Sequence, residues 1–227
     1  MGAVIISLLP FILGSAIVPV QIIIVTLLLK SPTQGLLKAT AYVGGMTTIR
    51  LLQGLIFGMI LTNSAAISTE ESGGKSPFVL TLLLVLGLFL LITAYRIWRK
   101  EDDPDAPPPK WLTMIDNLTP FKAFGIGFGL LLIGAKFWVF TLGAIGVIGE
   151  AQLGQPAGTA AFLLFVILAE SLLLIPLIIR VVIPKQAQSI LENTSAWLTR
   201  YNRPIVIVVS LVFGLLFFYQ GVSGLLG

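Results

Sequence analysis

Long apolar stretches dominate this chain and restrict it to folds that place helices in a lipid bilayer. The hydrocarbon core of a bilayer is about 30 Å thick, and an α-helix needs roughly 20 apolar residues to cross it. Six stretches reach that length: 4–29, 36–62, 77–98, 123–149, 157–183 and 204–226. Hydrophobic residues make up 56% of the sequence and the mean hydropathy is +1.01, which is more apolar surface than one soluble core can hide. We therefore predict an all-α integral membrane protein with six transmembrane helices.

The charges between these stretches predict the orientation of the bundle. Cytoplasmic loops collect Lys and Arg close to the helix ends. The first, third and fifth connections hold most of the basic residues, namely Lys30, Lys38, Arg99, Lys100, Lys110, Lys122, Lys185, Arg200 and Arg203, whereas the second and fourth hold Lys75 with Glu70, Glu71 and Glu150. We expect both termini on the extracytoplasmic side of the plasma (inner) membrane. No basic residues precede the first stretch, so we expect it to be a retained helix and not a signal peptide.

The third connection, 99–122, divides the chain into two halves, 1–98 and 123–227. It contains the acidic, proline-rich run RKEDDPDAPPPK, which is typical of a solvated cytoplasmic linker. Its later part, around Trp111, and residues 186–201 carry apolar side chains at helical spacing, and we expect both to lie in the cytoplasmic interface. They are either connectors or a gate or partner-docking surface. Three spans per half give the halves opposite orientations, so we predict two inverted three-helix repeats.

Three charged residues lie deep inside the apolar stretches: Arg50, Lys136 and Glu170. A charge at a helix centre costs about 2.5 to 3.5 kcal/mol on insertion scales, so we expect these side chains to face one another or a wet cavity. Pro19 lies mid-way along the first stretch, where it kinks the helix and leaves a backbone carbonyl without its donor. Residues 134–136 occupy the corresponding depth in the fourth stretch, and similar intervals lead onward to Arg50 and to Glu170. The two halves therefore place opposite charges at equivalent depths.

These residues and their polar neighbours form the predicted substrate site. Its members are Pro19, Gln21, Arg50, Gln53, Lys136 and Glu170. Two alternatives remain open: Arg50 and Glu170 could form an ion pair that only fixes helix packing, and Lys136 could extend along its stem toward an interface. By default, Gln21 and Gln53 are helix-contact residues.

The composition excludes several kinds of chemistry. There is no Cys and no His, which excludes disulfides, thiol redox chemistry and metal sites built on those residues. Glu170 is the one carboxylate deep in the apolar stretches, which disfavours export of divalent metals, since hard cations need several oxygen ligands. The net charge of +4 follows from membrane topology and gives no reason to expect nucleic acid. We expect no metal, no cofactor and no enzymatic activity.

The segments GSAIVPVQIIIV and GAKFWVFTLGAIGV, with the charged proline-rich loop between the halves, resemble the lysine-exporter (LysE) superfamily of small membrane exporters. The length and the loop are most similar to its GAP or Sap branch, the glycolipid- or sulfolipid-addressing proteins. Members usually carry Asn-Pro-Lys in the fourth helix, and this chain keeps the lysine of that motif as Lys136.

The leading functional hypothesis is a secondary exporter with a midplane cavity. Arg50 and Lys136 would hold a carboxylate, phosphate or sulfate, and Glu170 would hold an amine or exchange a coupling proton. The cargo would be an anionic or zwitterionic molecule, either an amino acid or a lipid headgroup. The alternative is a scaffold without transport activity that assists a complex for lipid synthesis or export. A homodimer through small-residue helix faces is compatible with the sequence.

Overall fold

The computed structural model describes residues 2–65, 77–100 and 118–226, and this part of the chain is built from α-helices without strands. The helices are α1 (Gly2–Ala16), α2 (Pro19–Lys30), α3 (Gly35–Ala65), α4 (Pro77–Arg99), α6 (Pro120–Ile133), α7 (Ala135–Glu150), α8 (Gln155–Ala169), α9 (Ser171–Val182) and α10 (Pro184–Leu226). Most of the predicted linker 99–122, including its interfacial segment around Trp111, lies outside the described residues.

Three of the predicted spans consist of two helices joined at a sharp bend. The bends are 57° between α1 and α2, 71° between α6 and α7, and 64° between α8 and α9. Two single helices, Val79–Arg99 and Pro184–Leu226, are long and apolar enough to cross a membrane, and the bent pairs raise the number of candidate spans in the described chain to five. The protein is therefore an all-helical membrane protein. The predicted span 36–62 corresponds to α3, which carries the polar residues of the predicted site and is not among these candidates.

The bends have different local causes. Pro19 is the first residue of α2 and has no N–H to continue the helix from α1. Gly134 separates α6 from α7 in an extended conformation, with φ −73° and ψ 95°. Glu170 separates α8 from α9 with φ −103° and ψ 0°, and no proline or glycine adjoins it. The sequence therefore predicts the first break strongly through Pro19 and the second weakly through Gly134. It has no helix-breaking residue at the third.

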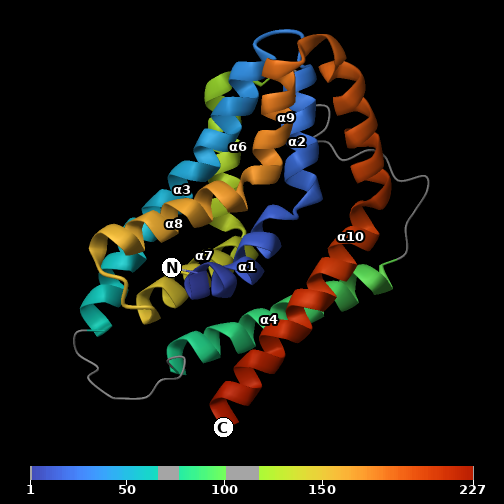
Figure 1. The fold of residues 1–227 in the computed structure, drawn as a ribbon. Helices are drawn as coiled ribbons and strands as arrows, with labels where there is room; N and C mark the ends of the chain where they lie inside the picture. Colours follow the sequence, from blue (N-terminus) through green and yellow to red (C-terminus); the bar gives the residue numbers. More distant parts are fainter. Residues whose placement is uncertain (1, 66–76, 101–117, 227) are drawn as a thin grey trace.

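The breaks divide the interior into two hydrophobic clusters. The first cluster combines α2, α6 and α9 with the starts of α3, α7 and α10, and includes Val25, Leu28, Tyr42, Met46, Leu131, Phe137, Leu173, Leu177, Leu191 and Leu198. The second combines α1, α7 and α8 with α4 and the end of α10, and includes Leu8, Phe11, Leu83, Leu86, Phe140, Phe165, Ala169, Phe213 and Phe217. Figure 1 shows α2, α6 and α9 on one side of the bends and α1, α7 and α8 on the other.

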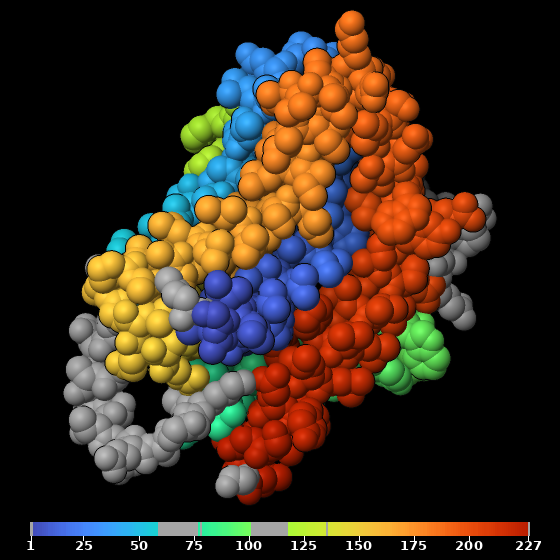
Figure 2. All heavy atoms as spheres, viewed as in Figure 1, coloured from blue at the N-terminus to red at the C-terminus, as the bar shows by residue number. Residues whose placement is uncertain are grey.

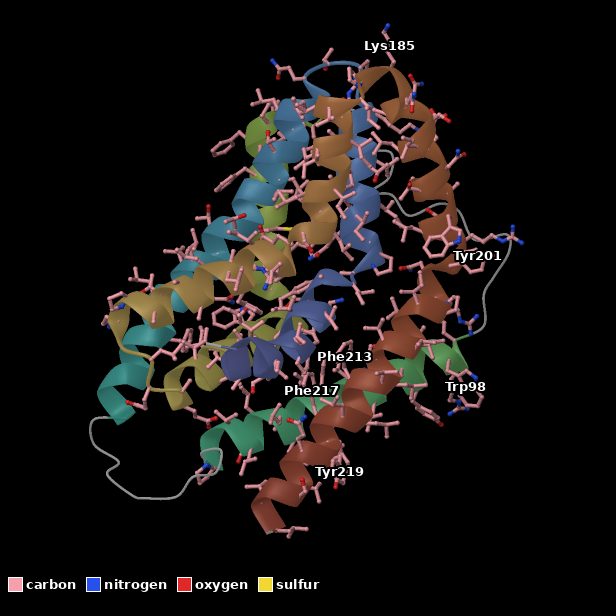
Figure 3. All side chains as sticks on the ribbon, in the orientation of Figure 1. Trp98, Lys185, Tyr201, Phe213, Phe217 and Tyr219 are labelled. Atoms are coloured by element: carbon pink, nitrogen blue, oxygen red, sulfur yellow. The ribbon has the colours of Figure 1, made fainter. Side chains whose placement is uncertain are left out.

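The C-terminal helix α10 runs along both clusters without interruption. The predicted interfacial segment 186–201 is its first part and the predicted span 204–226 its second, with Pro204 inside the helix. In Figure 2 α10 forms a ridge along one edge of the molecule, and α1 lies between α8 and the C-terminal part of α10. Phe213 and Phe217 point from this part toward α1 and α4 (Figure 3), and the Phe217 ring stacks on Phe11 at a centroid distance of 5.2 Å.

Contacts of Arg203 and of Lys30 join the predicted cytoplasmic connections to one another. Arg203 Nη2 donates to the carbonyl oxygen of Trp98 at 3.0 Å, which links the fifth connection to the third. Lys30 Nζ lies 3.5 Å from Glu192 Oε1, which links the first connection to the fifth. Trp98 and Tyr201 lie at the same outer edge of the molecule (Figure 3).

Candidate functional site

A buried ion pair joins the two halves of the chain. Arg50 Nε lies 3.3 Å from Glu170 Oε1, and the two side chains are 0% and 4% exposed. Thr47 Oγ1 donates to Glu170 Oε2 at 2.6 Å, and Arg50 Nη1 donates to Thr141 Oγ1 at 3.3 Å. We call these four residues the buried polar cluster.

The backbone explains why these side chains meet. Thr47, Arg50 and Gln53 follow one another at intervals of three along α3, and residues at this spacing share a helix face. Thr141 lies within α7, and Glu170 occupies the break between α8 and α9. Because the helix is interrupted at Glu170, the carboxylate is presented at the end of one helix and the start of the next.

The buried polar cluster lies between the two hydrophobic clusters. Ala169, just before Glu170, belongs to the second cluster, and Leu173, one turn later, belongs to the first. Ile49 in the first cluster adjoins Arg50, whose guanidinium lies 5.8 Å from the ring centroid of Phe165 in the second. The one buried ion pair of the described chain thus lies at the level of the helix breaks.

The hydrogen-bonding capacity of this region is only partly used. Arg50 Nε and Nη2, Glu170 Oε1 and both polar atoms of the Gln53 amide are buried and have no hydrogen-bond partner in the described structure. A buried polar group without a partner costs about 1 to 3 kcal/mol, and such groups usually bind water or a ligand. The free N–H donors on Arg50 and Gln53 can donate to oxygen atoms of a polar or anionic group.

Pro19 and Gln21 lie at the break between α1 and α2. Pro19 is buried, and Gln21 is 1% exposed with its Nε2 lacking a partner in the described structure. Ser15 Oγ, on the α1 side of the same break, also lacks one there. No described hydrogen bond or ion pair joins Gln21 to the buried polar cluster, so these residues form a second polar position at the same structural discontinuity.

Lys136 follows the break at Gly134 and is the second residue of α7. Its side chain is half-buried, and its ammonium lies 4.9 Å from the ring centroid of Phe137. No described hydrogen bond or ion pair connects it to Arg50 or Glu170. Thr141 lies five residues further along α7, about 7.5 Å along the axis. The structure thus pairs two of the three predicted intramembrane charges and leaves the third at a neighbouring break.

Sequence reasoning missed Thr47 and Thr141, although both complete the hydrogen bonding of the ion pair. Thr47 could have been found, because it lies one turn before Arg50 on the same helix face. Thr141 has no such signal, since its contact depends on how α7 packs against α3. Among the described residues no group of three or more carboxylate, Cys or His side chains could hold a metal ion.

Comparison with known proteins gives one match. A family model described as "Sap, sulfolipid-1-addressing protein" matches residues 8–223 and so covers nearly the whole chain. The search of curated proteins and the search of solved structures each gave no match.

Proposed function

The chain belongs to the Sap, sulfolipid-1-addressing protein family, and from that premise we propose that it is a secondary transporter. It exports an anionic or zwitterionic lipid along a path that passes the three helix breaks. The observation that carries the proposal is the buried Arg50–Glu170 pair with unused donors on Arg50. Broken helices that meet near the bilayer midplane are typical of the substrate sites of transporters.

In this proposal Arg50 binds the anionic group of the cargo. Its Nη2 is buried and has no described hydrogen-bond partner, so it can donate to a sulfate, phosphate or carboxylate oxygen without first losing a bond. Gln53, one turn along the same face of α3, offers a second donor. Lys136 at the neighbouring break holds the cargo on its way to or from this position, and Gln21 lines the break at Pro19.

Glu170 provides coupling. Its Oε1 faces Arg50 and its Oε2 accepts a hydrogen bond from Thr47, so the carboxylate is held beside the guanidinium that the cargo would bind. An anion bound at Nη2 brings a second negative charge close to Glu170, and protonation of Glu170 removes the repulsion between the two. The proposal therefore uses a proton as the coupling ion.

The cargo class follows from the family and from the charges together. The family description names a sulfolipid, whose headgroup would carry a strong anion, and this favours a lipid over an amino acid. The pair Arg50 and Lys136 against Glu170 leaves one surplus positive charge, which suits an anionic or zwitterionic headgroup.

We also propose six spans arranged as two inverted repeats. The bent pairs provide three spans and α4 and α10 two more, so α3 is the sixth; its 31 residues extend about 46 Å, which is ample for a bilayer. Each half begins with a bent pair, α1 with α2 and α6 with α7, which supports the repeat. The contacts of Arg203 with Trp98 and of Lys30 with Glu192 support a common, cytoplasmic side for the basic connections. Both termini would then face outward from the inner membrane.

Transport by the purified chain in proteoliposomes tests the function. A fluorescent phosphatidylglycerol in one leaflet reports its transfer to the other leaflet, and a labelled amino acid reports the alternative cargo. We expect Glu170→Gln to lower the lipid transfer rate at least tenfold, since a change of about 1.4 kcal/mol is a factor of ten. Glu192→Gln removes an exposed carboxylate on α10 and is the matched control, with no expected effect. Transfer by Glu170→Gln at the wild-type rate would refute the mechanism, and transfer no faster than in protein-free liposomes would refute the function.

The second candidate is a membrane scaffold for a lipid-synthesis or lipid-export complex. The observation that favours it is the ion pair itself, because a matched buried pair can serve only to fix helix packing. A scaffold requires no lipid transfer by the isolated chain, and it tolerates replacement of Arg50 and Glu170 by a well-packed apolar pair. The proteoliposome assay therefore separates the two functions.

A further inference from the structure

A hollow beside the turn between α2 and α3 lies apart from the buried polar cluster. It encloses about 530 Å³, within the range of small-molecule sites, and its wall includes Leu29, Ser31, Pro32, Gln34, Gly35, Leu36, Leu37, Thr40 and Arg180. The turn that forms its floor is tight: Gln34 has φ 54°, and a Cβ on Gly35 would lie 2.7 Å from the carbonyl oxygen of Leu29. The shape of the hollow therefore depends on glycine at position 35.

One exposed cation lies at the edge of the hollow. Arg180, in the last turn of α9, is exposed at its edge and has no ion-pair or hydrogen-bond partner among the described residues. Lys38 is 3% exposed and donates from Nζ to Ser31 Oγ at 2.6 Å, so a buried ammonium lies directly behind a hydroxyl of the wall. The lining side chains include no carboxylate, and the nearby Glu192 is paired with Lys30.

Apolar side chains surround this charge on the outer surface. Leu36 and Leu37 are 42% and 54% exposed, and Val181 and Val182, which follow Arg180, are 62% and 68% exposed. Exposed aliphatic side chains beside a lone arginine are typical of the level at which lipid headgroups meet hydrocarbon, where a long cationic side chain reaches the interface. A ligand in this hollow would therefore have an acyl chain as well as an anion.

We propose that this hollow is a binding site for the headgroup of an anionic membrane lipid, and that Arg180 is the main side chain that binds it. The Ser31 and Thr40 hydroxyls already donate to the carbonyl oxygens of Thr33, Leu36 and Leu37, so the Arg180 guanidinium provides the donors for the headgroup oxygens. The leucine pair contacts the first part of the acyl chain. Basic pockets between transmembrane helices are known to bind phosphate-bearing headgroups in this way. The site requires no transport activity, so it stands or falls independently of the function proposed above.

Lipid binding to the purified full chain tests the proposal, with native mass spectrometry reporting bound phosphatidylglycerol and bound phosphatidylcholine. Arg180→Gln should weaken phosphatidylglycerol binding about fivefold, since one interfacial basic residue contributes about 1 kcal/mol, and should leave phosphatidylcholine binding unchanged. Arg200→Gln is the matched control because it removes one exposed charge from α10, away from the hollow, and it should bind phosphatidylglycerol as the wild type does. Arg180→Lys should recover most of the affinity, which also shows that position 180 tolerates substitution.

Three results would overturn the proposal. Arg180→Gln could bind phosphatidylglycerol as tightly as the wild type does. Arg200→Gln could lose as much affinity, which would mean that general surface charge attracts the lipid. Inorganic phosphate at millimolar concentration could displace the lipid fully, which would make the ligand a free anion.

Discussion

At the scale of single residues, the Arg50–Glu170 pair is the feature with the largest energetic consequence. Both side chains are buried, and each ion would be uncompensated without the other. Removing one partner of a buried pair costs about 3 to 5 kcal/mol, whereas replacing both by apolar residues is often neutral. The pair therefore adds little net stability while making each residue dependent on its partner.

We expect Glu170→Ala to lower the free energy of unfolding by about 3 to 5 kcal/mol, because it leaves the Arg50 guanidinium buried and unpaired. The double substitution Arg50→Leu with Glu170→Leu should recover most of that loss. Unfolding in mixed micelles, followed by helical circular dichroism, measures both. A double variant whose loss equals the sum of the losses of Glu170→Ala and Arg50→Leu measured alone would show that the two losses are independent.

At the scale of elements, close approach of backbones fixes the pairing of α3 with α6. A Cβ on Gly127 would overlap the carbonyl oxygen of Tyr42, and one on Gly45 would overlap that of Phe124. Small residues permit this approach in membranes, where packing replaces the hydrophobic effect as the force between helices. Gly125, two residues before Gly127 on α6, has open space at its Cβ position.

Gly127→Ala should therefore destabilise the protein by about 1 to 3 kcal/mol, as overpacking does in other tightly packed interiors. Gly125→Ala on the same helix is the matched control and should be neutral or slightly stabilising, since alanine favours helix by about 0.5 to 1 kcal/mol. Thermal unfolding in detergent compares the two variants. Equal midpoints for both variants would contradict the packing described for Gly127.

The same elements show which features of the fold are visible in the sequence. Apolar length marks the segments that became α4 and the three bent pairs, and Pro19 marks the first bend, because both depend on local chemistry. No helix-breaking residue adjoins Glu170 in the sequence, and in the structure its carboxylate contacts Arg50 and Thr47 from another helix. The continuity of α10 through Pro204 was equally hidden, because the polar character of 186–201 is typical of a separate connector.

The candidate site was predictable to a similar degree. Similar sequence intervals, from Pro19 to Arg50 and from residues 134–136 to Glu170, predicted that Arg50 and Glu170 lie at equivalent depth. In the structure the two side chains form an ion pair. Of their threonine partners, Thr47 could have been inferred because it shares a helix face with Arg50, whereas the contact of Thr141 depends on tertiary packing. The place of Lys136 in the site stays a prediction, because the described contacts connect it only to the Phe137 ring.

At the scale of the whole molecule, the absence of cysteine makes the proposed orientation directly testable. A single cysteine introduced at an exposed position becomes the one thiol in the protein. Gln34→Cys and Gln188→Cys, in the first and fifth connections, should react with a membrane-impermeant maleimide only after the cells are opened. Gln155→Cys, at the start of α8, should react in intact cells. Reaction of Gln34→Cys in intact cells would reverse the proposed orientation.

The three breaks also have a mechanical consequence. The helices α3 and α10 are continuous, whereas the pairs α1–α2, α6–α7 and α8–α9 are interrupted. The continuous helices form a frame, and each broken segment can turn about its own break. The helix α8 has 15 residues and so extends about 22 Å from Glu170. A rotation of about 10° at that residue would move its far end by roughly 4 Å, which is comparable with the contact distance between two carbon atoms. If Glu170 changes its partner as proposed, the lever arm of α8 would amplify that change into an opening of atomic width.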